Sequence, residues 1–400
     1  MRCKDAPTCA VCCSIGDRER ARSFTPQHGF CRVTGAGHER YRETRHFASL
    51  DGLRCLSVVP VIWHHSTPRP LPGLLGKGPA GVDLFFCISG FLITTLLLRE
   101  KARTGSIHLP NFYARRALRI LPLYYALLIA YALFALCLPA DTPQRAHFLG
   151  ALPLYASFTA NWLVNFGVGF PILFSFAWSL CVEEQFYAFW PWLVRRLSRA
   201  GALAAMLALV AGDALAERGA FGPLLPPGGL ALRIVTSFAA PIGFGALLAL
   251  LLDDARSFRW LRALLGANWS APLALFGVGA CAVWRAPLLG FQLALTALVG
   301  ACVIREEHGL THLLRARAPA YVGRISYALY LLHLTAIGSV RRLFPAHAGS
   351  ARFVFWLSLP IAFGLAVLSE RYLEAPFSIL RARFRETSPA AEPALDPLPE

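Results

Sequence analysis

The chain has 400 residues, of which 56% are hydrophobic and 16% are charged, and it carries a formal net charge of +16. Soluble domains carry roughly a quarter charged residues, so this composition argues against a soluble protein and favours one membrane body. The basic residues lie in short loops between apolar runs. Membrane topology and anionic lipid headgroups explain them better than nucleic-acid binding, and no nucleic-acid partner is expected.

The first 45 residues are polar and charged, unlike everything that follows. They include a Cys9-x-x-Cys12-Cys13 cluster, but no second pair at zinc-site spacing follows it, so no metal site is expected. We interpret residues 1–45 as a disordered, Cys-containing cytoplasmic extension. A start codon assigned too far upstream is the alternative.

Ten apolar segments are interpreted as membrane spans, since a helix needs about 20 mostly apolar residues to cross a bilayer. Residues 147–165 are apolar but interrupted by Pro153, and they are expected to form a short interfacial or re-entrant piece, or an eleventh span. The expected fold is an all-α integral membrane protein, a polytopic bundle of about 10 or 11 transmembrane helices over residues 46–380. The ten predicted spans lie near residues 49–66, 80–98, 117–138, 176–194, 201–216, 231–252, 269–284, 287–304, 321–340 and 353–369.

The charges in the loops predict how the protein is oriented in the membrane. The loops that this arrangement places in the cytoplasm hold 19 Lys and Arg residues, against 8 in the opposite loops. Because cytoplasmic loops carry the excess of basic residues, both termini are expected in the cytoplasm. Residues 381–400 lead into a Pro- and acid-rich end and are expected to be a disordered cytoplasmic tail.

The first span contains Arg54 and His65, eleven residues apart. In an α-helix this spacing puts them on one face, roughly 16 Å apart along the axis. Ionisable residues inside spans are costly and are functional candidates by default. Asp51, one turn before Arg54, suggests a pair of buried charges. The alternative is a snorkelling arginine and an interfacial histidine.

Carboxylates lie in the second and fourth spans. Asp83 enters the second span near the predicted level of His65, where it could orient the imidazole or cap its own helix. Glu183 and Glu184 are adjacent in the outer half of the fourth span. They point about 100° apart and therefore have different surroundings, and we favour Glu184 for a direct role.

Two further polar groups flank this region. Arg115, Arg116 and Arg119 lie where the third span enters the membrane, and arginines suit bidentate recognition of phosphate. The excess of basic residues that cytoplasmic loops carry, or binding to lipid headgroups, would also explain these three arginines. In the ninth span Ser326, Tyr330 and His333 form one polar stripe, which could line a cavity or join helices through hydrogen bonds.

Six ordered motifs across residues 46–380 resemble a known family. They are Asp51-Gly-Leu-Arg54 with His65, Gly81-Val-Asp83-Leu-Phe-Phe with Ser89-Gly-Phe-Leu-Ile, Arg116-x-x-Arg119-Ile-x-Pro122, Trp178-Ser-Leu-x-Val-Glu183-Glu184-Gln-Phe-Tyr187, Ser326-Tyr327-x-x-Tyr330-Leu-x-His333 and Glu374-x-Pro376-Phe377. Together they resemble the acyltransferase-3 family of bacterial membrane O-acyltransferases, which modify surface polysaccharides and some small glycosides. Cys55 and Cys181 depart from the family pattern, where a Gly and a Ser are common.

The resemblance implies a multi-pass protein of the bacterial inner (cytoplasmic) membrane. It would transfer an acyl group, most often acetyl, from cytoplasmic acyl-CoA to a hydroxyl of a surface or exported glycan. Acetyl-CoA or another acyl-CoA is then a co-substrate, and no permanently bound cofactor is expected. Some members carry an extracytoplasmic hydrolase-like domain with no counterpart here, so the chain is expected to act alone or with a separate periplasmic partner.

Each candidate residue then receives an expected role. His65 takes the proton from the acceptor hydroxyl, and Asp83 or Glu184 orients it. Arg54 lies along the path of the pantetheine arm, and Arg115, Arg116 and Arg119 hold the phosphates of coenzyme A. The substrate cavity is expected to be lined by Glu183, Ser326, Tyr330 and His333.

Other functions fit a multispan chain with buried charges. A transporter of sugars or small molecules would show substrate flux without an acyl donor. A non-catalytic membrane scaffold would tolerate alanine at Arg54 and His65. A glycosyltransferase that uses a lipid-linked donor is expected to have acidic residues in a large outer loop, whereas the loops here are short and contain few charges.

Overall fold

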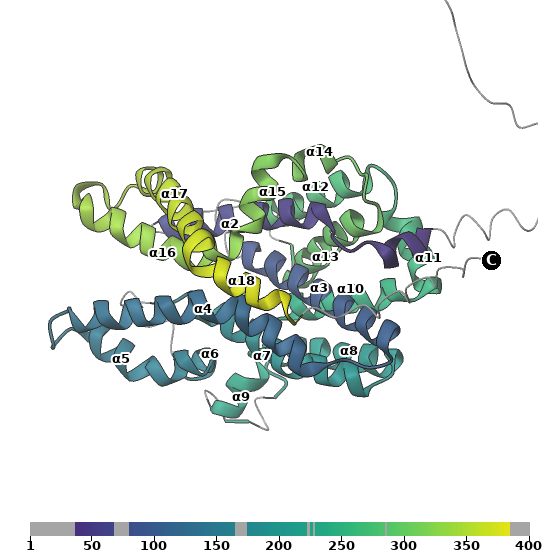
Figure 1. The fold of residues 1–400 in the computed structure, drawn as a ribbon, viewed down its shortest axis with the longest axis horizontal. Coiled ribbons are helices and arrows are strands. Elements are labelled where there is room, and N and C mark those ends of the chain that lie inside the picture. The colour runs from purple at the N-terminus through teal and green to yellow at the C-terminus, as the bar shows by residue number, and fades with distance from the viewer. Residues whose placement is uncertain are drawn as a thin grey trace, which may run out of the picture.

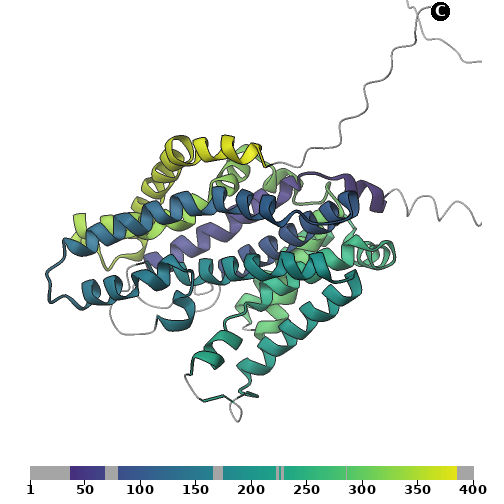
Figure 2. The same ribbon diagram turned by 60° about the horizontal axis from the view of Figure 1, so that its bottom comes forward.

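The computed structural model describes residues 37–67, 80–164, 174–221, 225–226, 229–284 and 286–384. In these ranges every regular element is helical, as expected for an all-α protein, and Figures 1 and 2 show how the helices lie together. After a short helix at residues 37–43, they are α2 (Ala48–Ser66), α3 (Ala80–Thr104), α4 (Leu109–Leu136), α5 (Pro143–Ala156), α6 (Ala160–Leu163), α7 (Ala177–Arg196), α8 (Arg199–Glu217), α9 (Leu230–Val235), α10 (Ala240–Asp253), α11 (Ala255–Leu265), α12 (Ser270–Val283), α13 (Leu288–Ile304), α14 (Thr311–Leu314), α15 (Arg317–Arg324), α16 (Ser326–Leu343), η2 (Pro345–His347), α17 (Ala351–Leu368), η3 (Ser369–Glu374) and α18 (Ala375–Ala382).

Side chains satisfy backbone groups at several helix ends. The hydroxyl of Ser198 accepts a hydrogen bond from the backbone N–H of Gly201 at the start of α8, and Ser350 caps α17 in the same way. At the end of α7, the ammonium group of Lys101 donates to the carbonyl oxygens of Val194 and Leu197, both at 2.7 Å. Helix ends leave such groups without intrahelical partners, so these contacts fix where α7 stops and α8 begins.

Four described helices are long and apolar enough to cross a membrane. They are α3, α4, the Arg199–Ala216 part of α8, and the continuous helix Ala351–Ala382. The pair α11 and α12 would add a fifth candidate, bent by 73°, and α10 and α13 are apolar but shorter. These helices support a membrane protein, and the count of about ten spans stays a prediction.

Two predicted spans are each divided between two helices in the structure. The span predicted at 231–252 is divided into α9 and α10, because the chain leaves the helix at Thr236 and Ser237, whose hydroxyls bond back to nearby carbonyls. Side chains of this kind compete with the helical ladder. The span predicted at 321–340 begins only at Ser326, because a separate short helix, α15, ends at Arg324.

The segment 147–165 forms most of α5 and all of α6. The helices are separated by a turn at Phe158, which has a φ of 55°, in the left-handed region that few non-glycine residues adopt. Helix α4 holds this turn, since the Tyr124 and Tyr125 hydroxyls donate to the carbonyls of Tyr155 and Ala156. At 14 residues, α5 is shorter than the length of about 20 that a span needs.

The folded body begins ahead of the predicted boundary at residue 46. Residues 37–43 are helical, and the Tyr41 side chain is 5% exposed. The Arg99 guanidinium of α3 donates to the carbonyl oxygens of Tyr41 and Thr44 at 2.7 and 2.5 Å, and it also lies over the ring of Phe47. The cysteine cluster at residues 9–13 and the tail beyond residue 384 lie outside the described residues.

Glycines allow the central helices to approach closely. A Cβ atom built on Gly90 of α3 would lie 1.9 Å from the carbonyl oxygen of Ile242 in α10, and one built on Gly245 would lie 2.0 Å from that of Cys87. Small residues at helix contacts are the usual means of tight packing in membranes, where apolar side chains gain little from leaving lipid. The close contact between α3 and α10 therefore requires glycine at both positions, because any side chain there would collide with the backbone of the other helix.

We expect Gly90→Ala to destabilise the protein by about 1–3 kcal/mol, because the added methyl group collides with backbone atoms rather than with a movable side chain. Gly364→Ala in α17 is the matched control, since a Cβ atom there meets nothing within 4 Å. Thermal unfolding of the purified proteins in detergent checks this. Equal midpoints for the two variants would contradict the close contact.

Candidate active site

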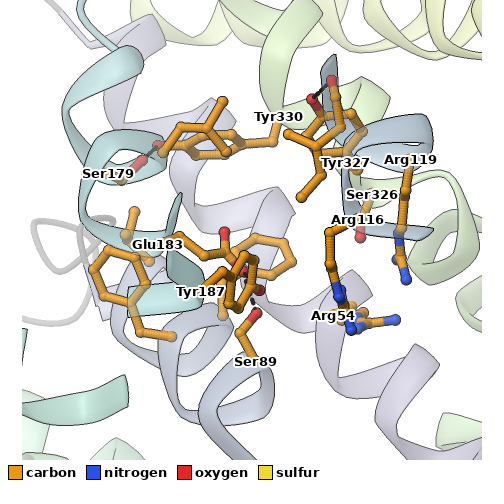
Figure 3. Close-up of a pocket in the computed structure, with 15 residues that line it drawn as sticks. Arg54, Ser89, Arg116, Arg119, Ser179, Glu183, Tyr187, Ser326, Tyr327 and Tyr330 are labelled. Atoms are coloured by element: carbon orange, nitrogen blue, oxygen red, sulfur yellow. Dashed lines mark hydrogen bonds between the residues drawn. The ribbon is translucent and has the colours of Figure 1, made fainter. Parts of the chain in front are cut away.

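A small polar cavity lies where α2, α3, α4, α7 and α16 meet. Its volume is about 80 Å³, and each of these five helices contributes at least one polar side chain. Figure 3 shows arginines at one end and the Ser179–Tyr330 pair at another. The cavity therefore draws on segments that are far apart in the sequence. Its polar lining consists of Arg54, Ser89, Arg116, Arg119, Ser179, Glu183, Tyr187, Ser326, Tyr327 and Tyr330.

Three arginines from two helices converge on this cavity. Arg54 comes from α2, and Arg116 and Arg119 come from α4. Asp51 lies 3.5 Å from the Arg54 guanidinium, in the pair that the sequence suggested, and Arg116 lies over the Tyr187 ring at 5.1 Å. Aromatic faces and nearby carboxylates both reduce the cost of a buried guanidinium.

The same arginines connect the small cavity to two larger ones. All three line a cavity of about 260 Å³, whereas Arg54 and Arg119 line one of about 930 Å³, which we call the large cavity. Five arginines but only three acids line the large cavity, and one of the acids, Glu370, is 3.4 Å from Arg324. Its charged lining is Arg54, Arg119, Arg317, Arg324, Arg381, Asp51, Glu370 and Glu374, and His46 also contributes.

Arg115 is engaged elsewhere. Its guanidinium lies 3.4 Å from the carboxylate of Glu100, which is almost completely buried, and it donates to the carbonyl oxygen of Phe384 at 2.8 Å. None of the three cavities described above includes Arg115 in its lining. Of the three neighbouring arginines, the structure therefore brings Arg116 and Arg119 together with Arg54, and it gives Arg115 a structural ion pair.

The two adjacent glutamates have different environments, as their angular offset predicts. Glu183 faces the small cavity, where its carboxylate accepts hydrogen bonds from the hydroxyls of Ser89, at 2.5 Å, and Tyr187. Glu184 is not part of that lining, and its Oε1 atom is buried without a hydrogen-bond partner among the described residues. The structure thus places Glu183, rather than the favoured Glu184, beside the arginines.

His65 lies near the other end of α2 from Arg54. Its Nδ1 atom is 3.0 Å from the carbonyl oxygen of Val61 and 3.2 Å from Nε2 of His333 in α16. These partners of Nδ1 are a backbone carbonyl and a second imidazole, not the carboxylate of Asp83 or Glu184 that the sequence suggested. Asp83 lies in the first turn of α3.

The histidine pair adjoins the small cavity without lining it. The His333 and Tyr330 ring centroids are 5.6 Å apart, and the Tyr330 hydroxyl, which lines the cavity, is hydrogen-bonded to Ser179. Of the three residues in the polar stripe of α16, Ser326 and Tyr330 therefore face the small cavity, whereas His333 faces His65. A line of polar groups runs from the arginines to the histidines.

Several cavity residues were not singled out from the sequence. Ser89, Ser179 and Tyr187 lie within the recognised motifs, and Tyr187 follows Glu183 by four residues, so it shares that helix face. That spacing could have identified the hydrogen bond between them. Ser89 comes from another helix, and only the packing of α3 against α7 brings it to Glu183.

The comparisons with known proteins agree on one family. The family model described as an acyltransferase domain, acyltransferase-3, matches residues 47–370. A Staphylococcus aureus (strain COL) protein named "Putative O-acetyltransferase" is 29% identical over 367 residues, which is 85% of this chain and 59% of that protein. The chain thus spans about three fifths of the length of this relative.

Two further relatives are named for peptidoglycan. The peptidoglycan O-acetyltransferase OatA of Listeria monocytogenes is 31% identical over 154 residues, which is 37% of this chain and 24% of that protein. A Bacillus subtilis protein named "Putative peptidoglycan O-acetyltransferase" is 27% identical over 371 residues, which is 84% of this chain and 56% of that protein.

No solved structure matches the chain. The family model nevertheless covers far more than half of it, including the five helices that form the small cavity. The protein therefore belongs to the acyltransferase-3 family.

Proposed function

We propose that this protein transfers an acyl group, most simply acetyl, from cytoplasmic acyl-CoA to a hydroxyl of a surface or exported glycan. The observation that carries the proposal is the convergence of Arg54, Arg116 and Arg119 on a small cavity whose lining residue Tyr330 adjoins the His65–His333 pair. A site of this kind combines anion recognition with a base, which are the two requirements of acyl transfer from a phosphorylated thioester.

The donor end of the site is the large cavity together with the neighbouring cavity of about 260 Å³, which Arg116 lines. Its excess of arginine suits the phosphates and diphosphate of coenzyme A, because guanidinium groups bind phosphate oxygens in a bidentate manner. The lining of the large cavity comes from the start of α2, from α4 and α15, and from η3 and α18, all next to loops that the charge pattern assigns to the cytoplasm. A donor bound there would direct its thin pantetheine arm past Arg54 toward His65.

The chemical step needs a base at the acceptor hydroxyl. His65 would remove that proton as the hydroxyl oxygen attacks the thioester carbonyl, forming the new C–O bond. The C–S bond then breaks, and the proton passes to the departing thiolate of coenzyme A. This scheme requires no covalent acyl-enzyme.

The acceptor class follows from the relatives. Two are named for peptidoglycan and one for O-acetyl transfer alone, so a cell-envelope glycan is the first acceptor to test. We further propose a bacterial inner-membrane location with both termini cytoplasmic. The acceptor would then approach from the outer face, where a separate periplasmic partner could present it.

Removing the base provides the first test. We expect His65→Ala to lower O-acyl transfer by about 100-fold or more, which is the size of a general base contribution. The measurement is the O-acetyl content of cell-envelope glycans in cells that lack the gene and are complemented with wild type or variant. The purified variant should remain folded in detergent, and full activity in it would refute His65 as the base. An acetyl content that does not depend on the gene would favour the transporter alternative, and flux assays would follow.

Adjacent arginines provide the second test. We expect Arg116→Ala to raise the KM for acetyl-CoA by about 10- to 100-fold, because it removes charge-assisted hydrogen bonds to phosphate. Arg115→Ala should instead lower the unfolding temperature by leaving Glu100 buried and unpaired, with little change in this KM. Steady-state kinetics with acetyl-CoA and thermal unfolding separate the two effects. A larger rise in KM for Arg115→Ala would reverse the assignment.

A further inference from the structure

Two imidazole rings from different helices face one another outside the small cavity. His65 of α2 and His333 of α16 have ring centroids 4.9 Å apart at an interplanar angle of 57°, and Nδ1 of His65 lies 3.2 Å from Nε2 of His333. His333 is completely buried, whereas His65 is partly exposed. The accessible ring is therefore His65, and His333 lies behind it.

The hydrogen-bond partners of each ring nitrogen in His65 and His333 indicate which nitrogen carries a hydrogen. Nδ1 of His333 lies 2.5 Å from the carbonyl oxygen of Tyr330, which can only accept, so this nitrogen carries the hydrogen and Nε2 carries the lone pair. Nδ1 of His65 faces that lone pair and also the carbonyl oxygen of Val61, both acceptors. Nδ1 of His65 therefore carries a hydrogen, and its lone pair is on Nε2.

We propose that His333 is a positioning residue, which holds His65 in the orientation and tautomer that make Nε2 of His65 the base. This inference rests on the proposed function. In the serine hydrolase triad a carboxylate fixes the tautomer of the catalytic histidine, and here a neutral imidazole together with a backbone carbonyl would have that role. As His65 accepts the proton, its Nδ1–H group keeps two acceptors, which stabilises the imidazolium that forms.

The other groups around the pair do not replace His333. The guanidinium of Arg341, also from α16, donates to the backbone carbonyls of His65 and Ser66, both at 3.2 Å, and so acts on the helix end rather than on the ring. The neighbouring ring of His64 lies edge-on to His65, with the centroids 5.3 Å apart. Asp83 lies in the first turn of α3. The hydrogen-bond acceptors at Nδ1 are Val61 and His333.

A residue that only joins helices would affect stability rather than the chemical step. The test therefore compares His333→Leu, which removes the acceptor, with His333→Gln, whose side-chain oxygen can accept at the place of Nε2. His64→Leu is the matched control, because it removes an imidazole next to His65 that is not a hydrogen-bond partner of Nδ1. Inside-out membrane vesicles expose the cytoplasmic face, so radiolabelled acetyl-CoA added outside reaches the donor site while the native glycan remains inside.

We expect His333→Leu to lower the maximal rate of label transfer by about 10- to 100-fold, with the KM for acetyl-CoA within about twofold of wild type, as for a group that acts only on the chemical step. His333→Gln should recover most of this loss, and His64→Leu should remain close to wild type. The inference is overturned if His333→Leu transfers acetyl at the wild-type rate, or if the glutamine and leucine variants are equally impaired while both remain folded.

His65→Ala in the same vesicles separates this inference from the proposed function. If His65→Ala transfers acetyl like wild type, the proposed base is wrong and His333 has nothing to position. If His65→Ala is inactive while His333→Leu is fully active with only a lower unfolding temperature, the proposed function stands. In that case His333 merely joins α2 to α16.

Discussion

The convergence of three partly buried guanidinium groups among apolar helices is the constraint on which the rest of this structure depends. Charges of one sign inside a bundle are costly unless nearby groups compensate them. Asp51 pairs with Arg54, and the Tyr187 ring lies beneath Arg116, while Ser89 and Tyr187 hold Glu183 nearby. The excess of arginine over acid continues into the large cavity, and this is why we propose a polyanionic donor rather than a neutral sugar as its ligand.

Helix α2 connects the two ends of the proposed reaction. It carries Arg54 near its start and His65 near its end, and it packs against α3, α15 and α16. Its position is tightly determined, since a Cβ atom on Gly323 of α15 would lie 1.8 Å from the carbonyl oxygen of Asp51. Close backbone contacts of this kind allow little sliding of α2 along α15. The separation between Arg54 and His65, the proposed anion-binding residue and the proposed base, is therefore set by one helix.

The histidine end of the site has fewer charged side chains than the arginine end. Ser179, Tyr330, His333 and His65 form a succession of neutral donors and acceptors, in contrast to the arginines and acids at the other end. Such a division suits a reaction whose donor is an anion and whose acceptor is a neutral hydroxyl.

Composition and motifs were sufficient to predict the helical class, the family and the candidate residues Arg54, Arg116, Arg119 and His65, because apolar runs and functional motifs are local in sequence. The break within 231–252 has a local signal that the predicted span did not use: Pro241 lies at the start of α10, where a helix tolerates proline, and the hydroxyls of Thr236 and Ser237 bond to nearby carbonyls ahead of it. The span count needs the membrane as well as the chain, and it remains a prediction.

The sequence by itself determined which residues can carry charge or bind protons, and which segments are apolar enough to be helices. Only the tertiary structure decided their partners. Arg115 and Arg116 are neighbours in sequence, yet one pairs with Glu100 and the other faces the cavity. His65 meets His333 from a helix more than 260 residues further along the chain. The physical reason is that helix periodicity fixes the face on which a side chain lies, whereas the group it meets depends on which helix packs against that face.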